Sequence, residues 1–251
     1  MQAAPPTPTM TPPALPGREQ TLAEHLEELR RRLGISLAAL LIAVGIAWTQ
    51  VDRIVEWVQQ PAAGRLAHFA YFSPAEPLVA YLKVSVLAGL LLAMPVILWQ
   101  VWGFIRTGLT PKERIWGQLL VGWGSLQFAA GVAFAYLVLL PLSLHMLLAI
   151  GEGRLIPVIS IDRYLSFVTS MAFWCGLAFE LPVVLYVLSR VGIVTAEWLR
   201  QQRAYAVLAL VIIAAVVTPT TDPVSLLLMA VPLIVLYEIS ILVTRLGAGR
   251  R

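Results

Sequence analysis

From Tyr164 to Leu188 the chain reads YLSFVTSMAFWCGLAFELPVVLYVL, a run that is long and apolar enough to cross a membrane. As a helix this run would extend roughly 37 Å, against about 30 Å for the hydrocarbon core of a bilayer. It carries one charged residue, Glu180, and Pro182 follows two positions later. A carboxyl group at that depth and a proline that frees a backbone carbonyl both need polar partners. We therefore expect other membrane-spanning helices to surround this one.

The composition of the whole chain indicates an all-α integral membrane protein. Of its 251 residues, 59% are hydrophobic and only 13% are charged, and the mean hydropathy is +0.81. The single cysteine, Cys175, and the three widely separated histidines predict no disulfide framework, no metal site and no cofactor site. We interpret the net charge of +4 as a sign of membrane topology and expect no nucleic-acid partner.

Hydrophobic runs and helix-capping signals predict the organisation of the chain. Residues 1–20 are expected to form a disordered, proline-rich tail, residues 21–245 a six-helix membrane domain, and residues 246–251 a basic cytoplasmic tail. An amphipathic helix at the membrane interface is expected before the first span. The fifth and sixth spans are expected to be short for a bilayer. The six transmembrane helices are predicted at about residues 33–48, 73–104, 116–139 (ending before Pro141), 164–188, 204–217 and 224–243.

The distribution of basic residues predicts the orientation of the six spans. With both chain ends on one side of the membrane, that side would hold 13 of the 18 lysine and arginine residues. Because basic residues are enriched in cytoplasmic loops, both termini are predicted to be cytoplasmic. Glu28 and Glu113 then lie on the same cytoplasmic face.

Glu28 and Glu113 are carboxylates in short segments that are otherwise rich in arginine and lysine. Held close together, they could bind a pair of guanidinium groups through bidentate, charge-assisted hydrogen bonds. Each also has a structural interpretation. Glu113 occupies the last position of a T-x-x-E capping box, and Glu28 could pair with Arg31 or Arg32 on a solvated helix face. Spacing alone favours the structural interpretations.

Glu180 is the strongest functional candidate inside a span, because ionisable residues at that depth usually have a function. It could relay protons, contact a ligand or form a hydrated notch in the bilayer. The structural alternative is a buried acid that bonds a neighbouring hydroxyl group. Asp222 is interpreted as a helix N-cap, and Glu238 as a side chain that extends to the membrane interface.

Eight motifs, in order along residues 22–245, together resemble the TatC family, the multispanning receptor of the twin-arginine translocase. Any one motif would be a weak signal, whereas the ordered set is very specific. The motifs are HLEELRRRL (25–33), SPAEPL (73–78), AGLLLAMPVILWQVWGFI (88–105), PKER (111–114), GVAFAY (131–136), AFELPVVL (178–185), TPTTDPVS (218–225) and PLIVLYEIS (232–240).

The resemblance implies a receptor or core component that has no catalysis of its own. It implies export of folded proteins across the bacterial inner membrane, driven by the proton-motive force. The implied partners are twin-arginine signal peptides, the single-span proteins TatA and TatB, and further copies of the chain in an oligomer with TatB. By motif position, the signal-peptide site would comprise Glu28, Arg30, Phe104 and Glu113.

The same resemblance assigns further roles inside the membrane and at its outer side. Glu180 and Pro182, in AFELP, would belong to an intramembrane cavity that faces lipid. Thr218, Asp222 and Leu226 become candidates for contact with TatA or TatB. Leu226 stands at a position where the family commonly has glutamine.

Two other functions would make different use of the intramembrane acid. One is a proton-coupled small-solute transporter that uses Glu180, although the sequence shows no internal repeat of the kind common in such carriers. The other is an intramembrane enzyme. The sequence contains no serine nucleophile elbow, no metal-ligand spacing and no pair of intramembrane aspartates, so the protein is predicted not to be an enzyme.

Overall fold

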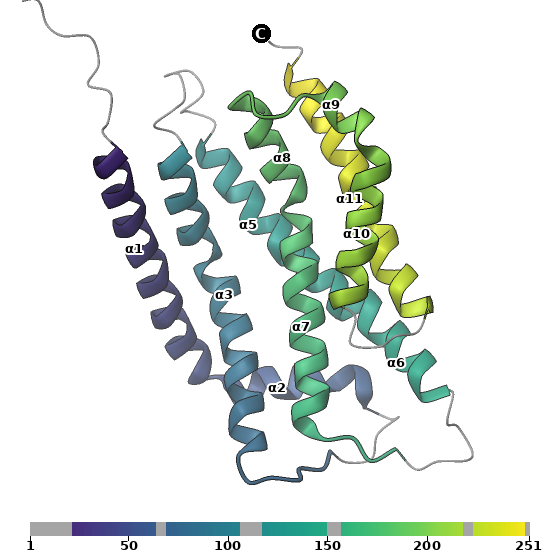
Figure 1. Cartoon of the computed structure of the whole chain (residues 1–251). Coiled ribbons are helices and arrows are strands. Elements are labelled where there is room, and N and C mark those ends of the chain that lie inside the picture. The colour runs from purple at the N-terminus through teal and green to yellow at the C-terminus, as the bar shows by residue number, and fades with distance from the viewer. Residues whose placement is uncertain (1–21, 64–68, 106–116, 150–156, 218–222, 249–251) are drawn as a thin grey trace, which may run out of the picture.

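The computed structural model describes residues 22–63, 69–105, 117–149, 157–217 and 223–248, and these residues form helices joined by short connections (Figure 1). The prediction of an all-α protein is confirmed for this part of the chain. Five helical segments are each long and apolar enough to cross a membrane. The chain is therefore a multi-pass membrane protein. The five segments are 24–48, 76–105, 119–149, 161–190 and 226–245.

Two of the long segments, 119–149 and 161–190, are each built from more than one helix. A shorter apolar helix, α10, belongs to the same bundle. The short helices α2 and α9 complete the fold, with the 3₁₀ turn Gln60–Ala62 after α2. The elements along the bundle are α1 (Leu22–Trp48), α3 (Glu76–Ile105), α5 (Gly117–Phe134), α6 (Leu140–Ala149), α7 (Ile161–Phe179), α8 (Leu181–Arg190), α10 (Arg203–Val217) and α11 (Pro223–Ala248), and the short helices are α2 (Val51–Gln59) and α9 (Ala196–Gln201).

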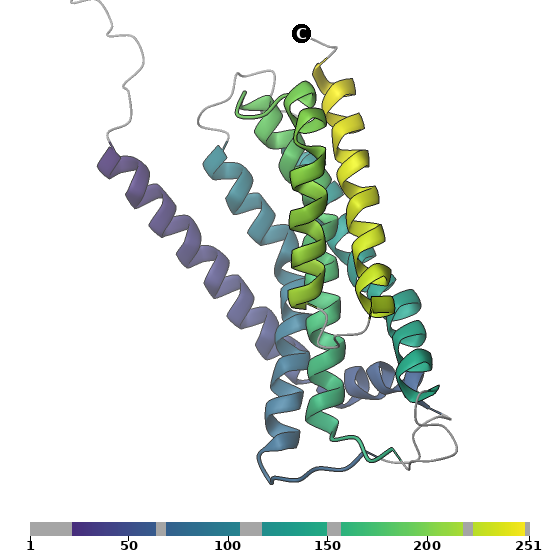
Figure 2. The same cartoon turned by 45° about the vertical axis from the view of Figure 1, so that its right-hand side comes forward.

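The beginning of α1 and the end of α11 lie at the same end of the bundle, which we call the termini end (Figures 1 and 2). At the opposite end, α2 crosses the bundle. Tyr136 donates a hydrogen bond of 2.6 Å to the Trp57 carbonyl, and Tyr164 donates one of 2.7 Å to the Val58 carbonyl. These bonds satisfy carbonyls in the last turn of α2 and so fix it across the helix ends.

The first span differs from the prediction, because α1 is one continuous helix from Leu22 to Trp48. The expected separate interfacial helix before residue 33 is therefore wrong. No proline interrupts this segment, and α1 packs along α3. At their crossing, Gly89 of α3 lies so close to α1 that a Cβ atom there would be 2.7 Å from the Val44 backbone.

The third span also continues past its predicted end. Pro141 was expected to stop it, but a π-helical turn, Ala135–Leu139, joins α5 to α6, and α6 runs to Ala149. The Leu140 amide donates to the Ala135 carbonyl, five residues back. A proline ring normally clashes with the carbonyl four residues before it, and the wider π turn gives that carbonyl room.

The fourth span, predicted as one helix, is broken at Glu180 into α7 and α8. Pro182 has no N–H group with which to donate to the Ala178 carbonyl. The Glu180 amide donates to the carbonyls of Leu177 and Ala178 instead, and its own carbonyl accepts from Val184 at 2.9 Å. The break therefore places the Glu180 side chain at a corner in the middle of the span.

The last two helices have unequal lengths. The segment predicted as a short fifth span forms α10, which has 15 residues, and its crossing of the membrane stays a prediction. The prediction of a short sixth span is wrong, because α11 has 26 residues and continues to Ala248. Glu238 of α11 forms an ion pair of 2.7 Å with Arg203 at the start of α10, so it is bound to a neighbouring helix at the termini end.

Candidate functional site

Glu28 lies on the face of α1 that packs against α3, near the termini end. Its Oε1 atom accepts hydrogen bonds from Nε of Arg32 at 2.9 Å and from Nη2 of Arg32 at 2.6 Å. Both side chains are largely buried, with 14% of Glu28 and 13% of Arg32 exposed. Spacing of four residues on a helix brings such side chains together. The partner is thus one of the two expected from sequence, Arg31 or Arg32, but the pair is enclosed between helices instead of being on a solvated face.

The second carboxylate oxygen of Glu28, Oε2, is buried and has no hydrogen-bond partner among the described residues. The first oxygen is held in place because Arg32 is itself fixed by α3. Nη1 of Arg32 donates to Oε1 of Gln100 at 3.3 Å, and the guanidinium lies against the Cα atom of Gly103. A buried carboxylate with one unsatisfied oxygen is a costly arrangement, and it is suited to receive a further donor.

An aromatic stack borders the same cluster. The rings of His25 on α1 and Phe104 on α3 are 4.4 Å apart between centroids, with 27° between their planes. Phe104 was assigned to the signal-peptide site by resemblance, and the structure places it on the same side of the helix pair as Glu28. Arg30 points elsewhere. Its side chain is 83% exposed and approaches Glu27 at 3.9 Å.

Several predicted site residues lie outside the described residues, namely Glu113, Thr218 and Asp222. The separation of Glu113 from Glu28 therefore stays a prediction. Leu226, near the start of α11, is half-buried and packs against the hydrophobic core. Its apolar side chain fits that environment.

Glu180 is buried, with 4% exposed, and neither carboxylate oxygen has a hydrogen-bond partner among the described residues. Its carboxylate lies against α5, where a Cβ atom on Gly124 would be 3.0 Å from Oε2. The absence of a side chain at Gly124 therefore provides the space in which the acid sits. The alternative of an acid bonded to a neighbouring hydroxyl finds no such bond in the described part of the chain.

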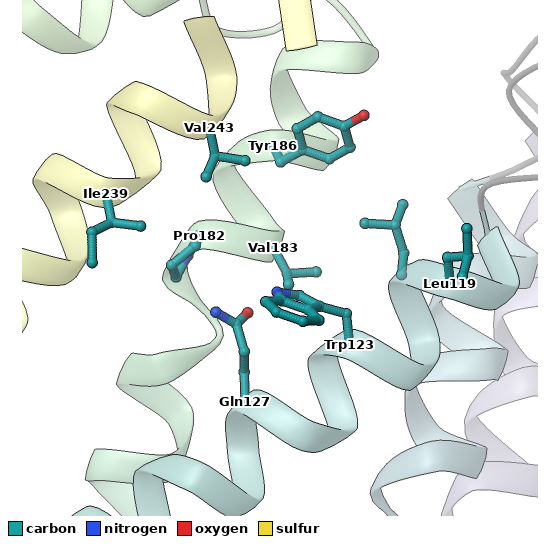
Figure 3. Close-up of a pocket in the computed structure, with 9 residues that line it drawn as sticks. Leu119, Trp123, Gln127, Pro182, Val183, Tyr186, Ile239 and Val243 are labelled. Carbon is teal, nitrogen blue, oxygen red and sulfur yellow. The ribbon is translucent and has the colours of Figure 1, made fainter. Parts of the chain in front are cut away.

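A groove of about 340 Å³ lies beside this corner, between α5, α8 and α11 (Figure 3). Pro182 lines this groove, and Glu180 is not among its lining residues. The assignment of both residues to an intramembrane cavity stays a prediction. Gln127 of α5 also lines the groove, and its Oε1 atom is buried without a partner among the described residues. The groove and the Glu180 carboxylate thus lie close to each other, on either side of the first turn of α8.

Sequence reasoning missed part of both clusters. Gln127 was visible as a lone amide in an apolar run, and that signal was not used. The roles of His25, Gln100 and Gly124 depend on how α1, α3 and α5 pack, which no local pattern in the chain indicates. Among the described residues, no group of three histidine, cysteine or acidic side chains is placed to hold a metal ion.

Comparison with known proteins points to a single family. Residues 24–232 match the family model described as Sec-independent protein translocase protein (TatC). The TatC protein of Aquifex aeolicus (strain VF5) is 40% identical over 235 residues, which cover 92% of this chain and 97% of that protein. The TatC protein of Carboxydothermus hydrogenoformans is 37% identical over 228 residues, covering 91% and 94%. A crystal structure of the twin-arginine translocase receptor TatC has a TM-score of 0.80 at 39% identity, and covers 90% of this chain and 100% of its own.

Proposed function

The chain belongs to the TatC family of Sec-independent protein translocases, and we propose that it binds twin-arginine signal peptides at its termini end. As a member of this family it is a transport component of a translocase and not an enzyme.

The observation that carries the proposal is the buried Oε2 atom of Glu28, which has no hydrogen-bond partner in the described part of the chain. An arginine of the peptide would donate to this oxygen, while Arg32 keeps Oε1 in place. Charge-assisted hydrogen bonds of this kind are stronger than neutral ones, and the planar guanidinium suits a carboxylate better than an ammonium group does. The second arginine of the peptide would bind Glu113 of the α3–α5 connection.

The aromatic stack supplies a surface beside this acidic group. Phe104 and His25 together offer a half-buried aromatic face at the end of the α1–α3 pair. Signal peptides place apolar residues after their basic segment. We propose that the first of those apolar residues contacts Phe104. The arginines and the apolar segment of the peptide would then bind at neighbouring positions.

The termini end is proposed to be cytoplasmic, in the inner membrane of a bacterium. Among the described basic residues, those at the termini end outnumber those at the opposite end, in agreement with the enrichment of basic residues on the cytoplasmic side. They are Arg30, Arg31, Arg32, Arg190, Arg200, Arg203 and Arg245 at the termini end, against Arg53, Lys83 and Arg163 at the opposite end.

The proposed partners are TatA and TatB, together with further copies of the chain. Thr218, Asp222 and Leu226, at the connection between α10 and α11 and the start of α11, are proposed as their contacts. The 15-residue α10 supports this assignment, because a helix of about 22 Å is shorter than the hydrocarbon core and deforms the bilayer or admits water at its end.

The second candidate function is a proton-coupled small-solute transporter that uses Glu180. Both of its carboxylate oxygens lack a partner among the residues that the structure describes, which favours a functional role. The two functions differ in what the protein does alone. A carrier would drive solute uptake into liposomes as a purified chain and lose it in Glu180→Gln. A translocase receptor would show no uptake, and Glu180 would instead accept a polar group of a partner during transport.

Peptide binding to the purified full chain tests the main proposal. A signal peptide with Arg-Arg should bind at least about tenfold more weakly to Glu28→Gln than to the unchanged chain, because one charge-assisted bond is lost. Glu27→Gln is the matched control, since Glu27 is exposed on the adjacent position and should leave binding unchanged. Replacing Arg-Arg by Lys-Lys in the peptide should weaken binding to the unchanged chain and have little further effect on Glu28→Gln. Equal affinity of all variants for both peptides would contradict the proposal.

A further inference from the structure

The groove between α5, α8 and α11 has three walls, each made by one face of a helix (Figure 3). α8 contributes Pro182, Val183 and Tyr186, and α11 contributes Ile239 and Val243, which are one helical turn apart. The wall from α5 consists of Leu119, Leu120, Trp123 and Gln127. None of these nine residues is charged, so the groove has the lining of a site for an apolar ligand.

The groove opens toward the side of the bundle, where lipid surrounds a membrane protein. Leu119 is 63% exposed and Trp123 is 58% exposed, and both form its rim on α5. Residues 119 and 127 are separated by about 12 Å along α5, which begins at the termini end. The groove therefore runs from the termini end into the depth of the membrane, in the direction that an acyl chain takes.

A positively charged side chain lies near the end of the groove that is closest to the termini end. Arg190, the last residue of α8, donates from Nε and Nη2 to the Tyr186 hydroxyl at 3.1 and 2.9 Å. Its guanidinium carbon is 5.2 Å from the centroid of the Tyr186 ring, and Tyr186 is one of the residues that line the groove. The apolar groove and the positive charge are thus joined through one tyrosine.

We propose that this groove binds one acyl chain of an anionic phospholipid, whose phosphate is bound by Arg190. Basic positions between transmembrane helices at the membrane interface are suited to anionic headgroups, and an apolar groove below them accommodates the attached chain. Its volume of about 340 Å³ is enough for part of one chain. This inference does not depend on how the signal peptide binds.

Two simpler interpretations of the same residues make different predictions. Arg190 at the end of α8 also complements the helix dipole, which would give it a structural role only. A transmembrane helix of another protein could also cover the groove, since its rim is apolar. The charge of Arg190 at the end of an uncharged groove favours the lipid, because a helix would gain little from a cation at that point.

Native mass spectrometry of the purified full chain tests the proposal, with phosphatidylglycerol and phosphatidylcholine of identical acyl chains as probes. The unchanged chain should retain one phosphatidylglycerol about fivefold more tightly than phosphatidylcholine. Arg190→Gln should remove this preference, and Arg200→Gln, on the exposed face of α9, should keep it. Val183→Trp should fill the groove and displace both lipids. Val184→Trp introduces the same side chain at a neighbouring exposed position and should not displace them.

Each other outcome counts against the site. Equal retention of the two lipids, or an unchanged preference in Arg190→Gln, would overturn the assignment of the headgroup. Arg190→Gln and Val183→Trp test the headgroup and the groove separately, and each is compared with the unchanged chain once thermal unfolding shows that it is folded. Unchanged lipid binding in a folded Val183→Trp, together with loss of a co-purified single-span protein, would assign the groove to a helix and overturn the proposal.

Discussion

Glu28 and Arg32 are joined through a single carboxylate oxygen: Oε1 of Glu28 accepts from both Nε and Nη2 of Arg32, at 2.9 and 2.6 Å. The pair therefore fixes the carboxylate without using its full capacity to accept hydrogen bonds. The other oxygen stays buried and unpartnered among the described residues. Arg32 thus acts as a positioning residue, and the proposed ligand completes the pair.

Gly103→Ala should weaken signal-peptide binding although it adds no charge and removes none. A Cβ atom at this position would be 2.7 Å from Cζ of Arg32, so the guanidinium must move and Glu28 loses its support. We expect roughly a tenfold loss of affinity, equivalent to about one charge-assisted hydrogen bond. Gly34→Ala is the control, because nothing lies within 4 Å of a Cβ atom there. Unchanged affinity in a folded Gly103→Ala would show that Arg32 does not position Glu28 for binding.

Gly89→Ala should destabilise the packing of α1 on α3. Alanine favours a helix by up to about 1 kcal/mol over glycine, but overpacking against backbone costs about 1–3 kcal/mol. The cost of overpacking should exceed the gain in helix propensity, because the Val44 backbone at 2.7 Å cannot rotate away as a side chain would. Thermal unfolding in detergent should therefore occur at a lower temperature than for the unchanged chain. Gly45→Ala, which meets nothing within 4 Å, should unfold no earlier than the unchanged chain.

Glu180→Met should stabilise the protein and impair export. The Glu180 carboxylate is buried and has no partner within the described ranges, and removing such a group recovers about 1–3 kcal/mol. Methionine has a similar length and no hydrogen-bonding demand. The midpoint of thermal unfolding should rise, while export of a twin-arginine precursor by cells that carry the variant should fall. Glu180→Gln retains two polar atoms and should give a smaller rise in stability. A lower midpoint in Glu180→Met would mean that the carboxylate has partners that stabilise the fold.

Much of the helix pattern could be predicted from the sequence, because apolar runs and capping signals are local. The second long helix was expected to end at about residue 104 after some 30 residues, and α3 has 30 residues and ends at Ile105. The third span was predicted to end before Pro141, and this is wrong because a π turn, Ala135–Leu139, accommodates the proline and the helix continues. That accommodation depends on the packing of the Ala135–Leu139 turn, and a single proline in a sequence does not reveal it.

The candidate site could be predicted only in part. Helical spacing left Arg31 and Arg32 as alternative partners of Glu28, and the choice of Arg32 and the burial of the pair follow from Gln100 and Gly103 on a different helix. Likewise, Glu180 was evident as an acid within a span, whereas the space that holds it is provided by Gly124 on α5. A helix pattern shows which residues share a face, and the glycines that permit close approach become meaningful only when the partner helix is known.

Photo-crosslinking from position 104 is the sharpest test of whether the signal peptide binds beside Glu28, because Phe104 stacks on His25 there. A photoreactive phenylalanine at position 104 should crosslink to a precursor with an Arg-Arg signal peptide, and excess free signal peptide should abolish the crosslink. The same photoreactive residue in place of Trp99, exposed on another face of α3, should give none. Glu28→Gln should reduce the crosslink from position 104. No crosslink from position 104, or equal crosslinks from positions 99 and 104 that do not respond to Glu28→Gln, would contradict the account.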